Sequence, residues 1–381
     1  MKAGVSILRT ASSPDLEAVC EDLHRGLEPL GGLEPFAPKG SMVLLKPNIG
    51  VAATPEEGRN TDPRVIEAMI ILLREVGVGE IIIGESSVVG TDTLEAFRAA
   101  GVDRIARQYG IPLVDLKRHG IVTREVPDPL ILPSIRLSSI IDEVDLILDL
   151  PKLKTIFAVP ISIGMKNLKG LLPDAEKKRF HHTDLSKAIV DLNKVVRPRL
   201  TVVDGIISSE LYEPRETNIL IAGGDVLAVD AVASSVIGLD PHEIEYLRLA
   251  GRADLGALDL ERIDILGESL SESRLNLKLA PDRTEGFAGL YPEVEIVDGQ
   301  PCSGCVASLY LSLKRAKERG LLERLPDLKL ALGSKIGGLP PGERVLCLGN
   351  CTKKLKGKYF LPGCPFMAME FCDLLERGLR K

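Results

Sequence analysis

Six of the seven cysteines in this 381-residue chain fall within its last eighty residues, and four of them lie in glycine-containing turns. Cys302 and Cys305 form a Cys-x-x-Cys pair, Cys351 follows Gly-Asn, and Cys364 stands between glycine and proline. Thiolates are soft ligands that suit iron-sulfur clusters, zinc or copper(I), and neighbouring glycines let backbone amides approach cluster sulfurs. The four cysteines therefore predict a metal cluster site.

The spacing of these cysteines leaves alternatives open. Between Cys305 and Cys351 lie 45 residues, and between Cys351 and Cys364 lie 12, which is not the compact run of a bacterial ferredoxin. Four thiolates also suit tetrahedral zinc, although zinc sites more often show two short cysteine pairs. A third interpretation is that these are buried structural cysteines, which behave as small hydrophobes. Cys372 is expected to face the core from the final helix, and Cys20 is isolated; neither is assigned a role.

A second group of chemically active residues is basic. From Lys152 to His182 the chain has seven lysines and arginines against two acids, a net charge of +5 within a chain of net charge -6. Ammonium groups and glycine-freed backbone amides suit carboxylate or phosphate, and adjacent histidines can transfer protons near neutral pH. The alternatives are an exposed basic face for the lysines and loop packing for the histidines. The predicted anion-binding residues are Lys46, Asn48, Lys152, Lys154, Lys166, Asn167 and Lys169, and the predicted proton-transfer residues are His181 and His182.

Short strands are expected to position the cysteines. Apolar runs predict strands at Val294 to Val297, Lys329 to Leu332 and Arg344 to Leu348, and the apolar periodicity predicts a helix from Ala307 to Arg319. Each of the four cysteines then falls in a loop at or soon after the carboxyl end of a strand. Open α/β sheets build their sites in such loops.

The rest of the chain also alternates between strands and helices. Thr61-Asp62-Pro63 is a helix start with Asp62 as N-cap, and Asp225 is interpreted as another N-cap. The alternation predicts an α/β fold with a mostly parallel sheet and helices on both faces. We place one domain at residues 1–270 and a cysteine-rich domain at 271–381, joined through residues 251–298. Asp204 and Asp230 are interpreted as residues that orient lysines, bind a cation or have a structural role.

The cysteine motifs carry a resemblance to a known family. The order Cys-x-x-Cys, a strand ending in Gly-x-Cys, and Pro-Gly-Cys-Pro before a helix resembles the proximal-cluster subunits of NADH:quinone oxidoreductase and nickel-iron hydrogenases. The resemblance implies a flavodoxin-like α/β domain that holds one 4Fe-4S cluster. Phe366 stands where that family usually has a second proline, and Cys347 is an alternative ligand. The implied cluster ligands are Cys302, Cys305, Cys351 and Cys364.

A second resemblance covers roughly residues 40 to 250. Several motifs in order resemble the family known as domain of unknown function 362, many members of which pair this domain with ferredoxin-type cysteine motifs. The chain departs from that family at residues 208–218, which read SSELYEPRETN where relatives tend to carry a Gly-x-Gly-Pro loop. The family name implies no reaction. The motifs are Lys46-Pro47-Asn48, Thr61-Asp62-Pro63, Gly84-Glu85-Ser86, Pro151-Lys152-Leu153-Lys154, Lys166-Asn167-Leu168-Lys169-Gly170 and Val203-Asp204-Gly205.

Composition excludes some classes of function. The net charge of -6 and the 4% aromatic content, with no tryptophan, argue against nucleic-acid binding. No stretch of eighteen apolar residues predicts a membrane span, and the first residues lack a signal pattern, so a cytoplasmic location is expected. In that compartment unpaired cysteines are better interpreted as reduced ligands than as disulfides.

The leading hypothesis is a cytoplasmic 4Fe-4S oxidoreductase or electron-transfer protein acting on an anionic small molecule or a redox partner protein. One alternative is an iron-sulfur lyase or isomerase that uses the cluster as a Lewis acid. Another is a non-enzymatic binding module stabilised by zinc or a cluster, so whether the chain is an enzyme stays open. No G-x-G-x-x-G nicotinamide fingerprint occurs, and a flavin is suggested by fold analogy alone.

Overall fold

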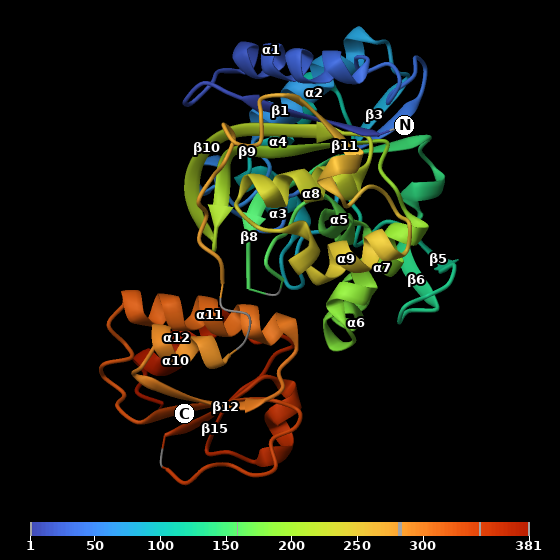
Figure 1. Cartoon of the computed structure of the whole chain (residues 1–381). Coiled ribbons are helices and arrows are strands. Elements are labelled where there is room, and N and C mark those ends of the chain that lie inside the picture. Colours follow the sequence, from blue (N-terminus) through green and yellow to red (C-terminus); the bar gives the residue numbers. More distant parts are fainter. Residues whose placement is uncertain (1, 158, 281–283, 343, 380–381) are drawn as a thin grey trace. The chain divides into compact units, whose positions relative to one another are not determined.

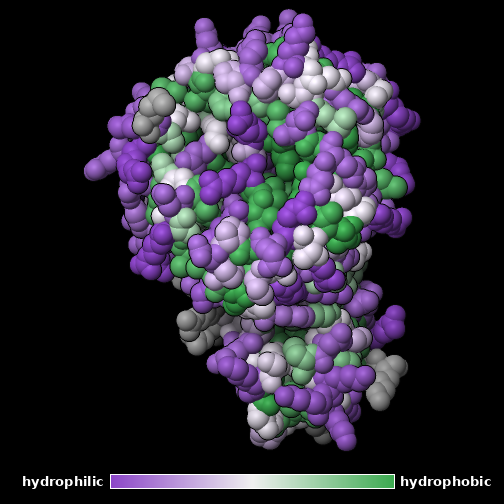
Figure 2. All heavy atoms as spheres, turned by 90° about the vertical axis from the view of Figure 1, so that its right-hand side faces the viewer, coloured by the Kyte–Doolittle hydropathy of each residue, from purple (hydrophilic) through white to green (hydrophobic). Residues whose placement is uncertain are grey.

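Two compact units make up the computed structural model, which describes residues 2–157, 159–280, 284–342 and 344–379. The first unit contains Met1–Thr155 and Ile161–Lys278, and the second contains Ile156–Pro160 and Leu279–Lys381. The chain thus enters the second unit briefly after Thr155 before it returns to the first. On the face of the molecule shown in Figure 2, hydrophilic residues cover most of the first unit, with hydrophobic residues visible between them.

The first unit is organised around a mixed sheet whose described strands follow the order β11-β1-β10-β9-β7-β2-β3-β4, with β8 paired to β9. All neighbours are parallel except β10, which runs antiparallel to β1 and β9. The predicted mostly parallel sheet is therefore confirmed. A separate hairpin joins β5 (Ile121–Glu125) and β6 (Ser134–Ser138). The strands of the large sheet are β1 Ala3–Arg9, β2 Met42–Pro47, β3 Glu80–Glu85, β4 Leu113–Asp115, β7 Leu146–Leu150, β8 Lys152–Thr155, β9 Leu200–Glu210, β10 Glu213–Gly223 and β11 Ile263–Gly267.

Helices cover both faces of this sheet, as the sequence predicts. In Figure 1, α1 and α2 lie side by side on one side of the sheet, and α8 and α9 lie on the other. This arrangement is the one expected when parallel strands are joined by helical crossovers. The helices of the first unit are α1 Leu16–Leu27, α2 Pro63–Glu75, α3 Thr93–Ala99, α4 Val102–Tyr109, α5 Gly164–Asn167, α6 Asp174–His182, α7 Leu185–Val195, α8 Val226–Val236 and α9 Glu245–Arg252.

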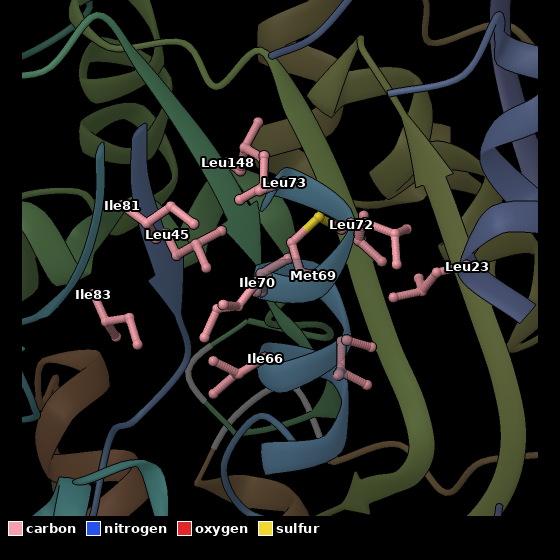
Figure 3. Packing of buried hydrophobic residues seen from close by; sticks show 14 of the residues in the cluster. Leu23, Leu45, Ile66, Met69, Ile70, Leu72, Leu73, Ile81, Ile83 and Leu148 are labelled. Carbon is pink, nitrogen blue, oxygen red and sulfur yellow. The ribbon is translucent and has the colours of Figure 1, made fainter. Parts of the chain in front are cut away.

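Helix α2 shows how local sequence and core packing agree. Asp62 caps its first turn by accepting a hydrogen bond from the Arg64 N–H, and Pro63 occupies the first helical position. Its apolar residues point toward Leu23 of α1 and toward the strands, as Figure 3 shows for Met69 and its neighbours. Each such side chain, fully buried, stabilises the fold by roughly 1.5–3 kcal/mol.

Three segments add to what the sequence analysis described. Residues 208–218, where relatives tend to carry a Gly-x-Gly-Pro loop, belong to a long hairpin of β9 and β10 that turns at Leu211 and Tyr212 with positive φ. Strand β11 lies within the segment expected to join the domains, yet it pairs with β1 in the large sheet. Residues 174–182, which have little apolar periodicity, form α6. None of the described helices is long and apolar enough to cross a membrane.

The second unit has its own sheet, in which β12 (Val294–Gly299), β13 (Leu328–Gly333), β14 (Val345–Leu348) and β15 (Tyr359–Leu361) are parallel and follow chain order. Helices α11 (Ser303–Glu318) and α12 (Ala368–Glu376) pack against each other. Helix α10 (Glu285–Leu290) contacts β12. This separate parallel sheet with its helices confirms a smaller α/β unit.

Aromatic rings fill part of the second unit. The ring of Phe157, which the chain contributes directly after β8, stacks on Tyr310 of α11 with 3.4 Å between centroids. The ring centroids of Phe287 and Phe157 are 5.7 Å apart. The short segment Ile156–Pro160 is therefore held in the second unit by aromatic packing.

Candidate functional site

A small cavity in the first unit brings together part of the predicted basic site. Its volume is about 160 Å³. Five of the predicted residues line it, whereas Lys46, Lys152, Lys154 and His182 are absent from its described lining. The described lining consists of Asn48, Gly50, Glu85, Ser86, Val88, Val89, Ser162, Lys166, Asn167, Lys169, Gly170, Lys177 and His181.

Lys46 lies behind the cavity in a buried ion pair. Its Nζ is 2.9 Å from Glu85 Oε2, and the two side chains are 0% and 3% exposed. Gly170 packs directly on this pair, because a Cβ atom at that position would lie 1.9 Å from Glu85 Oε1. Lys46 is thus held by Glu85, a residue that sequence reasoning did not assign to the site. The signal for Glu85 was its place at the exit of β3, in the Gly84-Glu85-Ser86 motif.

Lys152 is also held in a buried ion pair, 2.7 Å from Asp204 Oδ2. The same carboxylate oxygen accepts a hydrogen bond from the Asp62 N–H at 2.6 Å. Asp204 therefore connects the start of β8 to the N-terminus of α2, and the expectation that it orients a lysine is confirmed.

Two asparagines connect a buried carboxylate to Lys154. Asn167 Nδ2 donates to Asp149 Oδ1 at 2.8 Å, and Asn48 Nδ2 donates to Asn167 Oδ1 at 2.8 Å. Asn48 Oδ1 in turn accepts from the Lys154 ammonium. Each amide is thereby fixed in one orientation. Asp149 was not predicted, although it is the one acid in the apolar run of β7. Burial raises its pKa to about 7.

Three further lysines bring their amino groups to the cavity. Lys166 Nζ donates to Ser162 Oγ at 3.0 Å, and Lys169 Nζ lies 3.0 Å from His181 Nε2. Lys177, which was not predicted, donates to Ser86 Oγ at 2.6 Å. Burial lowers the pKa of Lys166 to about 8 and that of Lys177 to about 7, and it holds the pKa of Lys169 well below its ordinary value.

The histidines differ in their placement. His181, near the end of α6, lines the cavity, and burial followed by the charge of Lys169 holds its pKa well below the ordinary value. His182 is exposed. The structure therefore brings His181 to the lysines of the cavity and places His182 outside its lining.

The charge around the cavity favours an anionic ligand. Within the described part of the chain, Lys166 and Lys169 form no ion pair with a carboxylate, and the one acid that lines the cavity, Glu85, is paired with Lys46. A bound oxyanion would be the negatively charged partner of these two amino groups, since charged donors bind oxyanions most strongly.

The four predicted cysteine ligands lie near one another in the second unit. The Cys305 thiol hydrogen-bonds to Cys302, and its pKa is raised by that bond, by burial and by the charges of Cys302, Cys351 and Cys364. Gly349 lies beside them with φ of 81°, and a Cβ atom there would be 3.5 Å from Cys305 Sγ and 3.8 Å from Cys351 Sγ. In the ranges that the structure describes, no group of three or more His, Cys, Asp or Glu residues is positioned to hold a metal ion.

The elements that carry these cysteines differ from the expectation. Cys302 is the N-cap of α11 and Cys305 lies in its first turn, because the helix begins at Ser303, four residues before the apolar periodicity starts. Cys351 lies in a short 3-10 helix, Asn350–Leu355. The expectation of four loop positions was therefore wrong for Cys305 and Cys351.

Two hydrogen bonds, one of them to a side chain, connect the segments around the last two cysteines. The Asn350 N–H donates to Gly363 O, and the Gly363 N–H donates to Asn350 Oδ1, each at 2.9 Å. Cys351 and Cys364 each follow one of these residues directly. Their separation is thereby set by the protein chain.

Cys347 and Cys372 lie apart from this group. Cys347 is fully buried on β14, in a hydrophobic cluster with Ala331, Ile336 and Val345. A Cβ atom at Gly357 would lie 2.5 Å from the Cys347 sulfur, so the thiol is enclosed by backbone on that side. Cys372 is buried in α12, as expected.

Comparisons with known proteins concern mainly the first unit. The family model described as "Domain of unknown function (DUF362)" matches residues 43–235. This range contains every described residue that lines the cavity and ends before the four cysteines. A protein named "Thylakoid-associated protein sll1697", from Synechocystis sp., is 31% identical over an alignment of 267 residues, and the match covers 67% of this chain and 81% of that protein.

A solved structure is also similar in part. The crystal structure of a protein from Thermotoga maritima shares 13% sequence identity with this chain and has a TM-score of 0.38. The similarity covers 64% of this chain, which spans 61% of that structure, less than two thirds of its length.

Proposed function

Since this chain belongs to the domain of unknown function 362 family, whose name carries no reaction, we propose its function from its own residues. It is a 4Fe-4S iron-sulfur protein, and it acts as an oxidoreductase or electron-transfer protein on a small anionic molecule or a redox partner. What supports this proposal is that Cys305 hydrogen-bonds to Cys302 and has Cys351 and Cys364 near enough for their charges to act on its thiol, while the described positions do not by themselves form a metal-binding group.

The surroundings of the thiols fit a cluster with four thiolate ligands. Cys302 and Cys305 lie at the N-terminus of the 16-residue helix α11, where the helix dipole favours negatively charged sulfur. Gly349 leaves the space beside two of the sulfurs without a side chain. When bound, a 4Fe-4S cluster supplies one-electron transfer, and four cysteine ligands leave none of its irons open to substrate.

The cavity of the first unit supports the choice of an anionic ligand. Lys166, Lys169 and Lys177 line it, and the asparagine pair is held in a fixed orientation by Asp149 and Lys154. Such preorganised donors bind an anion without first having to reorder. His181 is the proton-transfer residue in this proposal, because it contacts Lys169 at the cavity.

The test is the metal content and the redox behaviour of anaerobically purified protein. About four irons and four sulfides per chain are expected, with visible absorption that bleaches and an EPR signal that appears on addition of dithionite. Cys351→Ser should lose the cluster, whereas Cys347→Ser, which changes a buried thiol outside the group, should keep it. One zinc without sulfide, or a cluster lost from Cys347→Ser and kept in Cys351→Ser, would refute the proposal.

The cellular location needs a separate experiment. The name of the relative associates that protein with the thylakoid. We keep the cytoplasm as the proposed location for this chain. Separating membrane and soluble cell fractions and probing both with an antibody tests it, and recovery of the protein mainly with membranes would contradict it.

A further inference from the structure

The cavity of the first unit contains an amino group placed for more than charge neutralisation. Lys169 lies in the short 3-10 helix Leu168–Leu171 that follows α5, and its Nζ is 3.0 Å from the Nε2 atom of His181. Both side chains line the same cavity of about 160 Å³. An amine and an imidazole at hydrogen-bond distance, both facing a ligand-sized space, are the components of nucleophilic attack with proton transfer.

The surroundings of Lys169 favour its neutral, nucleophilic form. Burial and the charges of Lys166 and Lys177 hold its pKa well below the ordinary value. Among the described residues, no carboxylate forms an ion pair with Lys169 that would keep it protonated. A lysine desolvated beside other cations is a known route to an amine that attacks carbonyl carbon.

Size and charge narrow the class of ligand. A cavity of about 160 Å³ is similar in volume to cavities that hold one benzene-sized molecule, so it suits a small ligand. Lys166 Nζ donates a hydrogen bond to Ser162 Oγ in the same cavity, and there it can form an ion pair with a carboxylate of the ligand. A ligand that uses both lysines needs an anionic end and, next to it, an electrophilic carbon.

We propose that Lys169 forms an imine with the carbonyl carbon of a short 2-oxo acid bound in this cavity, with His181 as the proton-transfer group. The Nζ lone pair forms a bond to the carbonyl carbon as the C=O π electrons move to the oxygen, and His181 passes one proton from Nζ to that oxygen to give a neutral carbinolamine. His181 then passes the second Nζ proton to the hydroxyl, which leaves as water while the nitrogen lone pair forms the C=N bond. One water is lost for each imine formed, and no oxidant or reductant takes part.

This inference deepens the anion-binding half of the proposed function and is independent of the cluster. Each could therefore fail without the other. If the chain bound zinc in place of a cluster, the lysine chemistry would be unchanged. If no imine formed, the four thiols would still be tested by their iron and sulfide.

The experiment is reductive trapping on the full chain. The protein is incubated with pyruvate or glyoxylate and sodium cyanoborohydride, its intact mass is measured, and the modified peptide is identified by tandem mass spectrometry. The expected result is one adduct per chain, on Lys169. Acetone, which has the carbonyl but no carboxylate, should give none under the same conditions.

Two variants make the result specific. Lys169→Arg keeps the positive charge but removes the nucleophile, so the adduct should be lost, whereas Lys178→Arg changes a lysine outside the described lining and should keep it. Circular dichroism tests whether both variants are folded. If Lys169→Arg is unfolded, the position of the adduct is decided by peptide mapping of the original chain after trapping. The same adduct in Cys351→Ser separates the outcome from that of the cluster. Adducts spread over several lysines, or their absence with both acids, would overturn the proposal.

Discussion

The buried ion pair between Lys46 and Glu85 makes the first unit sensitive to the loss of either partner. Lys46→Met keeps an unbranched side chain of similar length but removes the ammonium beside a carboxylate that is 3% exposed. That carboxylate keeps a hydrogen bond from the Ser86 N–H at 2.7 Å. We expect the free energy of unfolding to fall by about 3–5 kcal/mol, the usual cost of leaving a buried charge without its partner.

A second variant separates loss of charge balance from loss of packing. Lys46→Met combined with Glu85→Gln contains no unpaired charge at this position, and the glutamine can still accept from Ser86. Its free energy of unfolding should return to within about 1–2 kcal/mol of the original chain. The exposed pair between Arg107 and Asp103 on α4 is the matched control, and Asp103→Asn should change stability by less than about 1 kcal/mol.

The assay must report on the first unit alone, because the chain has two units and no tryptophan. Urea unfolding followed by circular dichroism gives the overall transition. Hydrogen exchange with mass spectrometry on peptides from β2 and β3 follows the unit that contains the pair. A single variant that loses less than about 1 kcal/mol, or a double variant less stable than the single one, would refute mutual compensation within the pair.

Three further predictions concern buried groups and close approaches. Burial raises the pKa of Asp149 from 3.8 to about 7. The protonated carboxyl therefore contributes fully to the free energy of unfolding below pH 3.8, and this contribution is lost as the pH rises to about 7. The Asp149→Asn variant should therefore be as stable as the original chain near pH 4 and more stable above pH 7. The gain is up to about 4 kcal/mol, at 1.36 kcal/mol per pKa unit. Urea titrations at the two pH values measure it, and an equal difference in the free energy of unfolding at both would contradict the prediction. Gly170→Ala, whose Cβ would collide with Glu85, should destabilise the first unit by about 1–3 kcal/mol, while Gly337→Ala, with nothing within 4 Å, should be neutral in thermal unfolding. Gly349→Ala introduces a side chain at φ of 81° beside two cysteine sulfurs, so purified protein should contain less iron than the original chain; unchanged iron would show that the space is not needed.

Sequence reasoning succeeded where the signal is local. Asp62 and Asp225 cap helices by accepting hydrogen bonds from backbone N–H groups two or three residues ahead. Apolar runs located β12, β13 and β14 for the same reason, since burial of a strand is recorded in its own residues. The start of α11 was missed because Ser303 and Gly304 carry no apolar periodicity.

Partner choice could not be predicted in this way. The excess of lysines between residues 152 and 182 indicated a basic site, and Asp204 was expected to orient a lysine, but the sequence did not identify that lysine as Lys152. Nor did it show that Lys46, over a hundred residues upstream, would be paired with Glu85 behind the same cavity. A charge count records which groups are present and leaves open which of them meet.

The sequence by itself determined the α/β alternation, the positions of caps and turns, and the chemical types gathered in each half of the chain. Only the tertiary structure decided that Lys169 meets His181, that Asp149 orients the two asparagines, and that Cys347 is buried away from the other four thiols. The physical reason is range: propensity and capping act between neighbours in the chain, whereas these contacts depend on the order of strands and on the packing of helices against them.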